Sequence, residues 1–241
     1  GIISSDTNSK VVIPVHCDKP ETAFYHPNPK AMTKALAWML NRLASITPSS
    51  SRRPNLLEMY CGCGAHTVAL GRSGLVSSIL AVELDPRLVQ ACKENIAKNS
   101  LQDLVEVRRG DAGRWAKEES RKRRSRQRKN RQSTRENQTE GSSETSEEKR
   151  RQGNSHYDVL LVDPPRQGLD EEVCRMATMT LDGEFAGGSG DITGKSHSCF
   201  RNILYVSCGH QALLKDLERL SPIYEVVTCV QMDLFPRTNS I

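Results

Sequence analysis

The stretch Leu56-Leu57-Glu58-Met59-Tyr60-Cys61-Gly62-Cys63-Gly64 runs from apolar residues into two closely spaced glycines. Its apolar half predicts a β-strand, because short apolar runs bounded by turn residues are typical of buried strands. Residues 67–71 can begin a helix soon after the glycines. A strand that passes through a glycine turn into a helix is the repeating unit of parallel sheets. The stretch therefore predicts an α/β fold.

Strand and helix patterns alternate on both sides of this stretch. Asn28-Pro29 and Asp85-Pro86 each combine a capping side chain with a proline, which predicts helices ending near Ala44 and Asn99. The other predicted elements are strands at 78–83, 104–107, 157–163, 202–207 and 225–234, and a helix through Leu213, Leu214 and Leu217. The strand at 157–163 is so apolar that it should be central and covered on both faces. This alternation predicts a mainly parallel, doubly wound sheet.

The chain reads as one domain, residues 1–241, with two insertions. Residues 117–156 are rich in charged and polar side chains, and residues 182–198 are rich in Gly and Ser. Such segments bury too little apolar surface to offset the entropy of ordering, so we expect a disordered insertion and a loop. Residues 117–153 hold 13 basic and 7 acidic residues, and they account for the net charge of +5. The rest of the domain is therefore close to neutral.

Several classes of protein are disfavoured by the composition. No apolar run approaches the length of a membrane span, so we expect no membrane segment. The first residues, 1–6, lack the order of a secretory signal and look like a cut into a longer protein. The eight cysteines are scattered, which favours reduced thiols and an intracellular protein. The oligomeric state stays open.

Polar residues and glycines follow three of the predicted strands. Gly62 and Gly64 follow the first, Glu83 ends the second at 21 positions beyond Gly62, and Asp163 ends the fourth. Ligands of parallel sheets bind at this edge, and an acid at such a distance typically accepts hydrogen bonds from ribose hydroxyls. The glycines alone could simply make a tight turn. Thr67 stands where a phosphate-binding loop would have a third glycine, which favours S-adenosyl-L-methionine over a dinucleotide.

The cysteines divide into a candidate nucleophile and others. Cys61 and Cys63 supply too few thiols for a structural metal site, and we expect no metal. Cys208 lies where the strand at 202–207 gives way to a helix, at the same edge as Glu83 and Asp163. Cysteine is often only a small buried apolar residue. That interpretation is assigned to Cys92, Cys174 and Cys229, whereas the position of Cys208 favours a nucleophile.

With these residues in view, the chain resembles the RNA uracil-5-methyltransferase family, over nearly its whole length outside the two insertions. The motifs that carry the resemblance are Phe24-Tyr25-His26-Pro27-Asn28, Leu57–Gly64, Val162-Asp163-Pro164-Pro165-Arg166-Gln167-Gly168-Leu169-Asp170, Ile203–Cys208 and Asp233-Leu234-Phe235-Pro236-Arg237-Thr238. The residues around Asp163 and Cys208 are most similar to the branch of the family that modifies the T-loop uridine of tRNA. The resemblance implies a Rossmann-like methyltransferase fold, S-adenosylmethionine as cofactor and RNA as partner.

The resemblance also assigns roles to single residues. It implies that Cys208 is the nucleophile and that Tyr60, Glu83 and Asp163 contact the cofactor, with Gly62 and Gly64 beside it. The family usually has glutamine at His26 and commonly asparagine at Ala65, so these two cofactor contacts depart from the pattern.

The resemblance further places a general base, a glutamate, just past Ile241, and a last strand antiparallel to the one at 202–207. We expect residues 1–241 alone to start the covalent reaction without turning over.

Three alternatives remain open at this stage. A methyltransferase acting on nitrogen usually has an aromatic residue where this chain has Arg166. The chain could also modify ribosomal RNA, or it could be a non-catalytic RNA-binding relative. The basic run 121–131 fits an RNA-binding arm, a nuclear signal or a solvated segment.

Overall fold

The protein is described by a computed structural model, which covers residues 2–4, 11–20, 28–47, 52–139, 157–180 and 199–233. Its centre is a five-stranded parallel sheet with the strand order β5-β4-β3-β6-β7. The strands are β3 (Asn55–Met59), β4 (Ser78–Glu83), β5 (Val105–Arg109), β6 (Val159–Val162) and β7 (Asn202–Tyr205). Every residue of β6 is buried, which confirms the prediction of a central strand covered on both faces.

The strand order shows that the sheet is doubly wound. The chain starts at the central strand β3, moves outward through β4 to β5, and then returns to add β6 on the other side of β3. The chain therefore reverses direction between β3 and β6, and ligands of open parallel sheets bind beyond the carboxyl ends of the strands at such a point. The predicted fold class is confirmed, and it puts the loops after β3, β4 and β6 at one edge.

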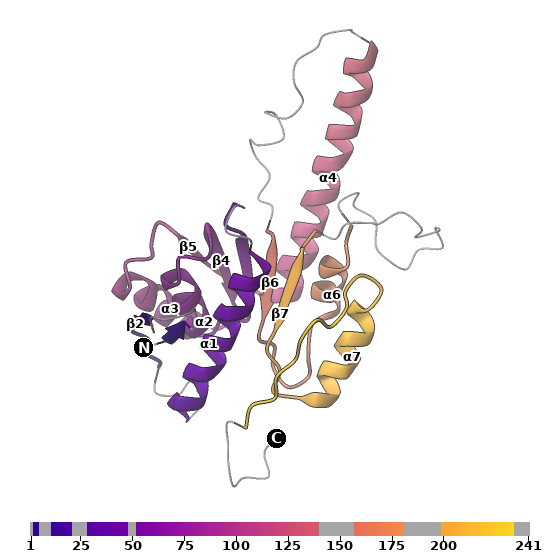
Figure 1. The fold of residues 1–241 in the computed structure, drawn as a ribbon. Coiled ribbons are helices and arrows are strands. Elements are labelled where there is room, and N and C mark those ends of the chain that lie inside the picture. Colours follow the sequence, from indigo (N-terminus) through magenta and orange to yellow (C-terminus); the bar gives the residue numbers. More distant parts are fainter. Residues whose placement is uncertain are drawn as a thin grey trace.

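Helices cover both faces of the sheet (Figure 1). One face packs against α1 (Pro29–Ile46), α2 (Ala65–Arg72) and α3 (Pro86–Lys98). The other face packs against α4 (Ala112–Thr139), α6 (Glu171–Ala177) and α7 (His210–Leu220). The predicted caps are present, since Asn28 accepts a hydrogen bond from the Ala31 N–H at 3.1 Å and Asp85 one from the Arg87 N–H at 2.8 Å.

The sequence did not predict the structure of the N-terminal segment. It begins with an antiparallel pair of strands, β1 (Ile2–Ser4), which lies against α1, and β2 (Val11–Ile13). Beyond β2, Asn99 holds the backbone of His16 through its side-chain amide, with Oδ1 at 3.0 Å from the His16 N–H and Nδ2 at 2.6 Å from its carbonyl. Asn95 holds Asp18 in the same way at 2.8 and 2.7 Å. These two amides fix the segment next to the glycine turn.

The strand predicted at 225–234 is not found. Residues 225–233 have no regular structure, and residue 234 lies outside the described part. A strand exists only where a partner supplies hydrogen bonds, and within the described residues no segment pairs with the outer edge of β7. Cys229, expected to be buried in that strand, is exposed, whereas Cys92 and Cys174 are buried as predicted.

The expected insertion at 117–156 also differs from the structure. Helix α4 continues through residue 139, and residues 140–156 lie outside the described part, as does the loop expected at 182–198. Arg, Lys, Glu and Gln favour helices, and Glu118 pairs with Lys122 one turn later at 2.6 Å. Helix formation here therefore does not depend on apolar residues. Among the described residues, no helix combines the length and apolar character needed to cross a membrane.

Candidate functional site

The turn between β3 and α2 has an unusual backbone. Tyr60, Gly62 and Gly64 adopt positive φ angles of 62°, 58° and 86°. A Cβ atom on Gly64 would lie 2.7 Å from the Sγ atom of Cys92 in α3, so the close approach of turn and helix requires glycine there. A Cβ atom on Gly62 would meet nothing within 4 Å. Gly62 therefore faces open space, as a residue beside a ligand should.

Glu83, at the end of β4, is tied to this turn. Its Oε2 atom accepts a hydrogen bond from the Gly62 N–H at 3.0 Å, and its Oε1 atom accepts from the N–H groups of Leu84 and Asp85 at 2.8 and 2.9 Å. Three backbone donors thus hold the carboxylate at the edge of the sheet. The side chain stays partly exposed, so it can still accept hydrogen bonds from a ligand.

Asp163, at the end of β6, lies close to a buried histidine. The His66 Nδ1 atom is 3.8 Å from an Asp163 carboxylate oxygen and 3.9 Å from the Glu58 Oε1 atom. Asp163 keeps 31% of its side chain exposed, whereas Glu58 and His66 are buried. Burial raises the pKa of Glu58 to about 8, although a hydrogen bond from the Thr67 hydroxyl at 2.6 Å opposes the shift. Asp163 is therefore the member of this group that can meet a ligand.

Tyr60 lies between the glycine turn and the loop after β6. Its hydroxyl oxygen accepts a hydrogen bond from the Asp170 N–H at 3.4 Å. Burial of the ring raises the pKa of its hydroxyl to about 12, so the group stays protonated at neutral pH. Tyr60 connects two of the strand-end loops, and the structure itself gives it no further role.

Cys208 is exposed and lies in the loop between β7 and α7, two residues before the helix begins. A Cβ atom on the next residue, Gly209, would lie 2.9 Å from the carbonyl oxygen of Arg166. The loop that carries Cys208 is thus packed against the loop that follows Asp163. The structure brings together at one edge the candidate nucleophile, Asp163 and the turn bound to Glu83.

A buried aspartate in α7 connects the same two loops. The Asp216 Oδ2 atom accepts hydrogen bonds from the Leu169 N–H and from the Tyr205 hydroxyl, each at 2.7 Å. Burial of the Tyr205 hydroxyl raises its pKa above the ordinary value, and the neighbouring Asp216 carboxylate raises it further. Nothing in the sequence singles out Asp216, because its partners lie on other elements.

Two more edge residues were missed by sequence reasoning. Leu84, after β4, exposes 57% of its surface, and Asp111 lies just beyond β5 with its carboxylate accepting from the Arg114 N–H at 2.8 Å. The rule that ligands bind beyond parallel strands could have identified both.

Of the two positions that depart from the family pattern, Ala65 is the first residue of α2, and His26 lies outside the described residues.

All eight cysteines are free thiols. Two of them, Cys17 and Cys63, approach to 3.9 Å between their sulfur atoms, and the hydrogen bond from Cys17 lowers the pKa of Cys63 to about 7. In the part of the chain that is described, no three His, Cys, Asp or Glu side chains are grouped to hold a metal ion.

The edge has the chemistry of a nucleoside site without phosphate. Gly62 offers open space, Glu83 and Asp163 offer carboxylate oxygens for hydroxyl or ammonium groups, and Leu84 offers an exposed apolar side chain. Neither the turn at 60–64 nor the segment 83–85 contains a basic residue for a phosphate. These residues fit S-adenosylmethionine, which joins a nucleoside to a charged amino acid.

Comparisons with known proteins agree with this chemistry. The family model described as tRNA (Uracil-5-)-methyltransferase matches residues 13–182. The tRNA/tmRNA (uracil-C(5))-methyltransferases of Sulfurimonas denitrificans and Pseudomonas fluorescens Pf-5 are 27% and 26% identical to the chain over 91% and 92% of its length. The chain spans about half of these relatives, 46% and 48%.

Among solved structures, the N-terminal domain of human METTL16 in complex with SAH has 15% identity and a TM-score of 0.38, covering 63% of this chain and 46% of that one. The family model extends over more than half of the chain and includes the glycine turn, Glu83 and Asp163. The chain therefore belongs to the tRNA (uracil-5-)-methyltransferase family.

Proposed function

We propose that this chain carries the catalytic site of an enzyme that uses S-adenosylmethionine to methylate C5 of uridine in RNA, with the T-loop uridine of tRNA as its substrate. The observation that carries the proposal is the packing of the Cys208 loop against the loop after Asp163, where Gly209 meets the Arg166 carbonyl. Methyl transfer to a covalently held base requires the nucleophilic thiol and the bound cofactor to lie at the same edge of the sheet.

Four residues of the edge would hold the cofactor. Glu83, held at the edge by the Gly62 N–H, would accept hydrogen bonds from ribose hydroxyls, and the partly exposed Asp163 would attract the ammonium group. Gly62 leaves room for the nucleoside, and Leu84 offers an apolar surface for the purine ring. When bound, S-adenosylmethionine supplies an electrophilic methyl group.

Cys208 would supply the nucleophile. Its thiolate forms a bond to C6 of uracil, and the electron pair of the C5–C6 double bond moves toward the C4 oxygen. The resulting enolate makes C5 nucleophilic enough to take the methyl group. A general base then removes the C5 proton, and the returning electron pair breaks the bond between sulfur and C6.

The reaction also requires the uridine to leave its stack, because C6 is not accessible to a thiolate within a stacked helix. Cys208 is exposed on the rim of the sheet, so an extruded base can reach it. Unstacking costs a few kcal/mol, least at positions that are already unpaired. A uridine in a loop is therefore a better substrate than one in a duplex.

The proposal is tested by trapping the covalent adduct. Full-length protein is incubated with S-adenosylmethionine and tRNA carrying 5-fluorouridine, whose C5 fluorine cannot be removed as a proton. We expect a denaturant-stable protein–RNA adduct, with the crosslinked peptide containing Cys208. Cys208→Ala should form none.

Cys229→Ala is the matched control, because Cys229 is the other cysteine that the structure shows exposed. It should form the adduct as the unmodified protein does. A missing adduct with the unmodified protein, or an adduct that survives Cys208→Ala, refutes the proposed nucleophile. A tRNA lacking the T-loop uridine that still forms the adduct refutes the proposed target.

A further inference from the structure

Helix α4 changes its charge along its length. Its first part, residues 112–120, contains two basic and two acidic side chains. The next part, residues 121–129, contains seven basic side chains and no acidic one. Positive charge is therefore concentrated where the helix leaves the domain rather than near the sheet's carboxyl edge.

The start of the basic part is anchored in the domain. Buried residues recur every three to four positions along the helix, at Ala112, Ala116, Glu119, Ser120 and Arg123. Arg123 and Glu119 form a buried ion pair at 3.1 Å, and the guanidinium lies 5.1 Å from the ring centre of the buried Phe200. These buried contacts end at Arg123, and the helix continues beyond it along the same axis. The direction of the later turns is therefore set by the anchored ones.

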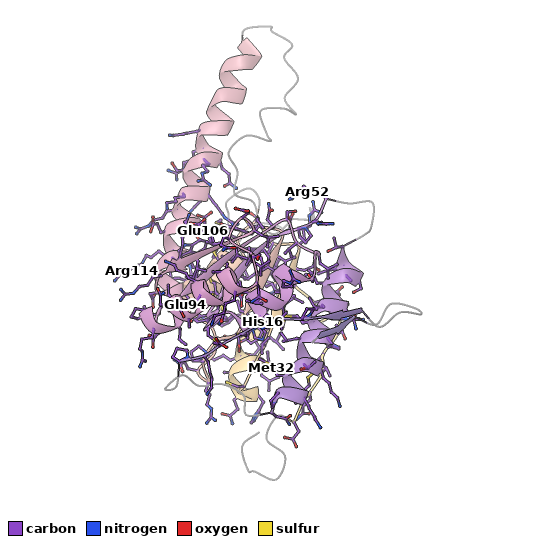
Figure 2. The ribbon with its side chains drawn as sticks, turned by 90° about the vertical axis from the view of Figure 1, so that its left-hand side faces the viewer. His16, Met32, Arg52, Glu94, Glu106 and Arg114 are labelled. Carbon is purple, nitrogen blue, oxygen red and sulfur yellow. The ribbon has the colours of Figure 1, made fainter. Side chains whose placement is uncertain are left out.

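Two views show where this direction leads. In Figure 1 and, after a quarter turn, in Figure 2, the distal part of α4 stands clear of the sheet. It projects on the side where Figure 2 labels Arg52, which lies before β3, and away from Met32 in the first turn of α1. At about 1.5 Å per residue, Lys129 is about 26 Å along the axis from Ala112. The basic part thus lies far from the candidate site.

Four basic residues share the solvent face of this part. Arg121, Lys122, Arg128 and Lys129 are exposed and fall on one side of the helix, opposite the anchored face; we call them the basic stripe. Residues 121–129 include no apolar side chain. The surface therefore lacks the anchors typical of protein interfaces and the apolar face of membrane-surface helices.

We propose that the basic stripe binds backbone phosphates of the RNA substrate, at a distance from the reactive uridine. This inference rests on the proposed function, because it takes RNA as the substrate. Arg and Lys are the side chains that neutralise nucleic-acid phosphates, and charges separated by one or two helical turns can follow a phosphate backbone. RNA that reaches the stripe extends well beyond the loop that enters the site.

The test compares full-length protein with a variant in which all four residues of the basic stripe are glutamine. Glutamine keeps a helix propensity close to that of Lys and Arg, so α4 should be retained. Binding to tRNA is measured from about 50 to 200 mM salt. Four lost phosphate contacts should reduce the salt dependence, log Kd against log salt, by about three, with at least tenfold weaker binding at 0.15 M.

Two controls define the outcome. Exchanging Arg for Lys and Lys for Arg at the same four positions keeps the charge and should keep affinity and salt dependence. A short T-loop hairpin carrying 5-fluorouridine should form the covalent adduct equally with the glutamine variant, which shows that the site is intact. If tRNA binding by the glutamine variant has the same salt dependence as binding by the unmodified protein, the inference is overturned. Failure of the unmodified protein to form any adduct instead refutes the proposed function.

Discussion

Replacing Asp216 should weaken both the fold and the candidate site. This side chain in α7 is only 2% exposed. Its Oδ2 atom accepts from the Leu169 N–H and from the Tyr205 hydroxyl at 2.7 Å each. The first donor belongs to the loop that starts at Asp163, and the second to the strand that leads into Cys208. One carboxylate oxygen thus sets the relative position of the two loops.

The structure distinguishes two substitutions. Asp216→Ala leaves the buried Leu169 N–H without an acceptor, at about 1–3 kcal/mol, and the half-buried Tyr205 hydroxyl at less. It also removes the carboxylate that faces Arg219 at 3.4 Å. We expect a loss of about 3–5 kcal/mol in the free energy of unfolding. Asp216→Asn can place its amide oxygen at the Oδ2 position and keep both strong bonds. Its loss should be about 1 kcal/mol, because the amide nitrogen that replaces Oδ1 cannot accept the hydrogen bond from Arg219.

Urea denaturation of the full-length protein measures these losses. Glu218→Ala is the matched control, because Glu218 is exposed on the same helix, and it should change stability by less than about 0.5 kcal/mol. Adduct formation with 5-fluorouridine tRNA, under conditions where each variant is folded, should be slowed by Asp216→Ala and nearly unchanged by Asp216→Asn. Equal losses for Asp216→Ala and Glu218→Ala, or for the Ala and Asn variants, would refute the reasoning.

Further predictions concern the glycine turn and its surroundings. Gly64→Ala combines a positive φ with a clash against α3 and should lower Tm strongly, whereas Gly62→Ala carries only the backbone strain of about 1–2 kcal/mol and should chiefly weaken S-adenosylmethionine binding in calorimetry. Cys17→Ala removes the hydrogen bond that lowers the pKa of Cys63, so the midpoint of Cys63 alkylation, followed by mass spectrometry, should rise from about pH 7.

Burial of Glu58 raises its pKa to about 8, so the folded state keeps a proton that the unfolded state loses above its usual pKa. Stability should fall between about pH 5 and 8, and Glu58→Gln should flatten this dependence in denaturation curves. If the stability of Glu58→Gln still falls over this pH range, another group causes the pH dependence.

The sheet and much of the site could be predicted from the sequence. Strand and helix alternate with clear periodicity, and such alternation leaves one main topology, the doubly wound parallel sheet. In that topology the carboxyl ends of the strands share an edge, so Gly62, Glu83 and Asp163 had to lie near one another. The structure adds a hydrogen bond between the Gly62 N–H and Glu83, which the sequence did not predict.

Other features depend on partners that local patterns do not reveal. Residues 225–233 were predicted to form a strand, yet a strand needs paired hydrogen bonds, and these residues pair with no described strand. Helix α4 has almost no apolar residues beyond 117, yet pairs such as Glu119 and Arg123 and the ring of Phe200 hold its early turns. In both cases the deciding contact comes from outside the segment.

The same reasoning explains why Asp216 escaped prediction while the position of Cys208 at the sheet edge did not. A candidate nucleophile at the end of a strand is placed by the topology, and the topology follows from periodicity. A residue that positions it is placed by side-chain contacts, here to the Leu169 N–H and the Tyr205 hydroxyl. These two donors lie 47 and 11 residues from Asp216 in the sequence, and nothing in the intervening sequence specifies either contact. If Asp216→Ala slows adduct formation as expected, the residues that align the loops belong to the site as much as the residues that react.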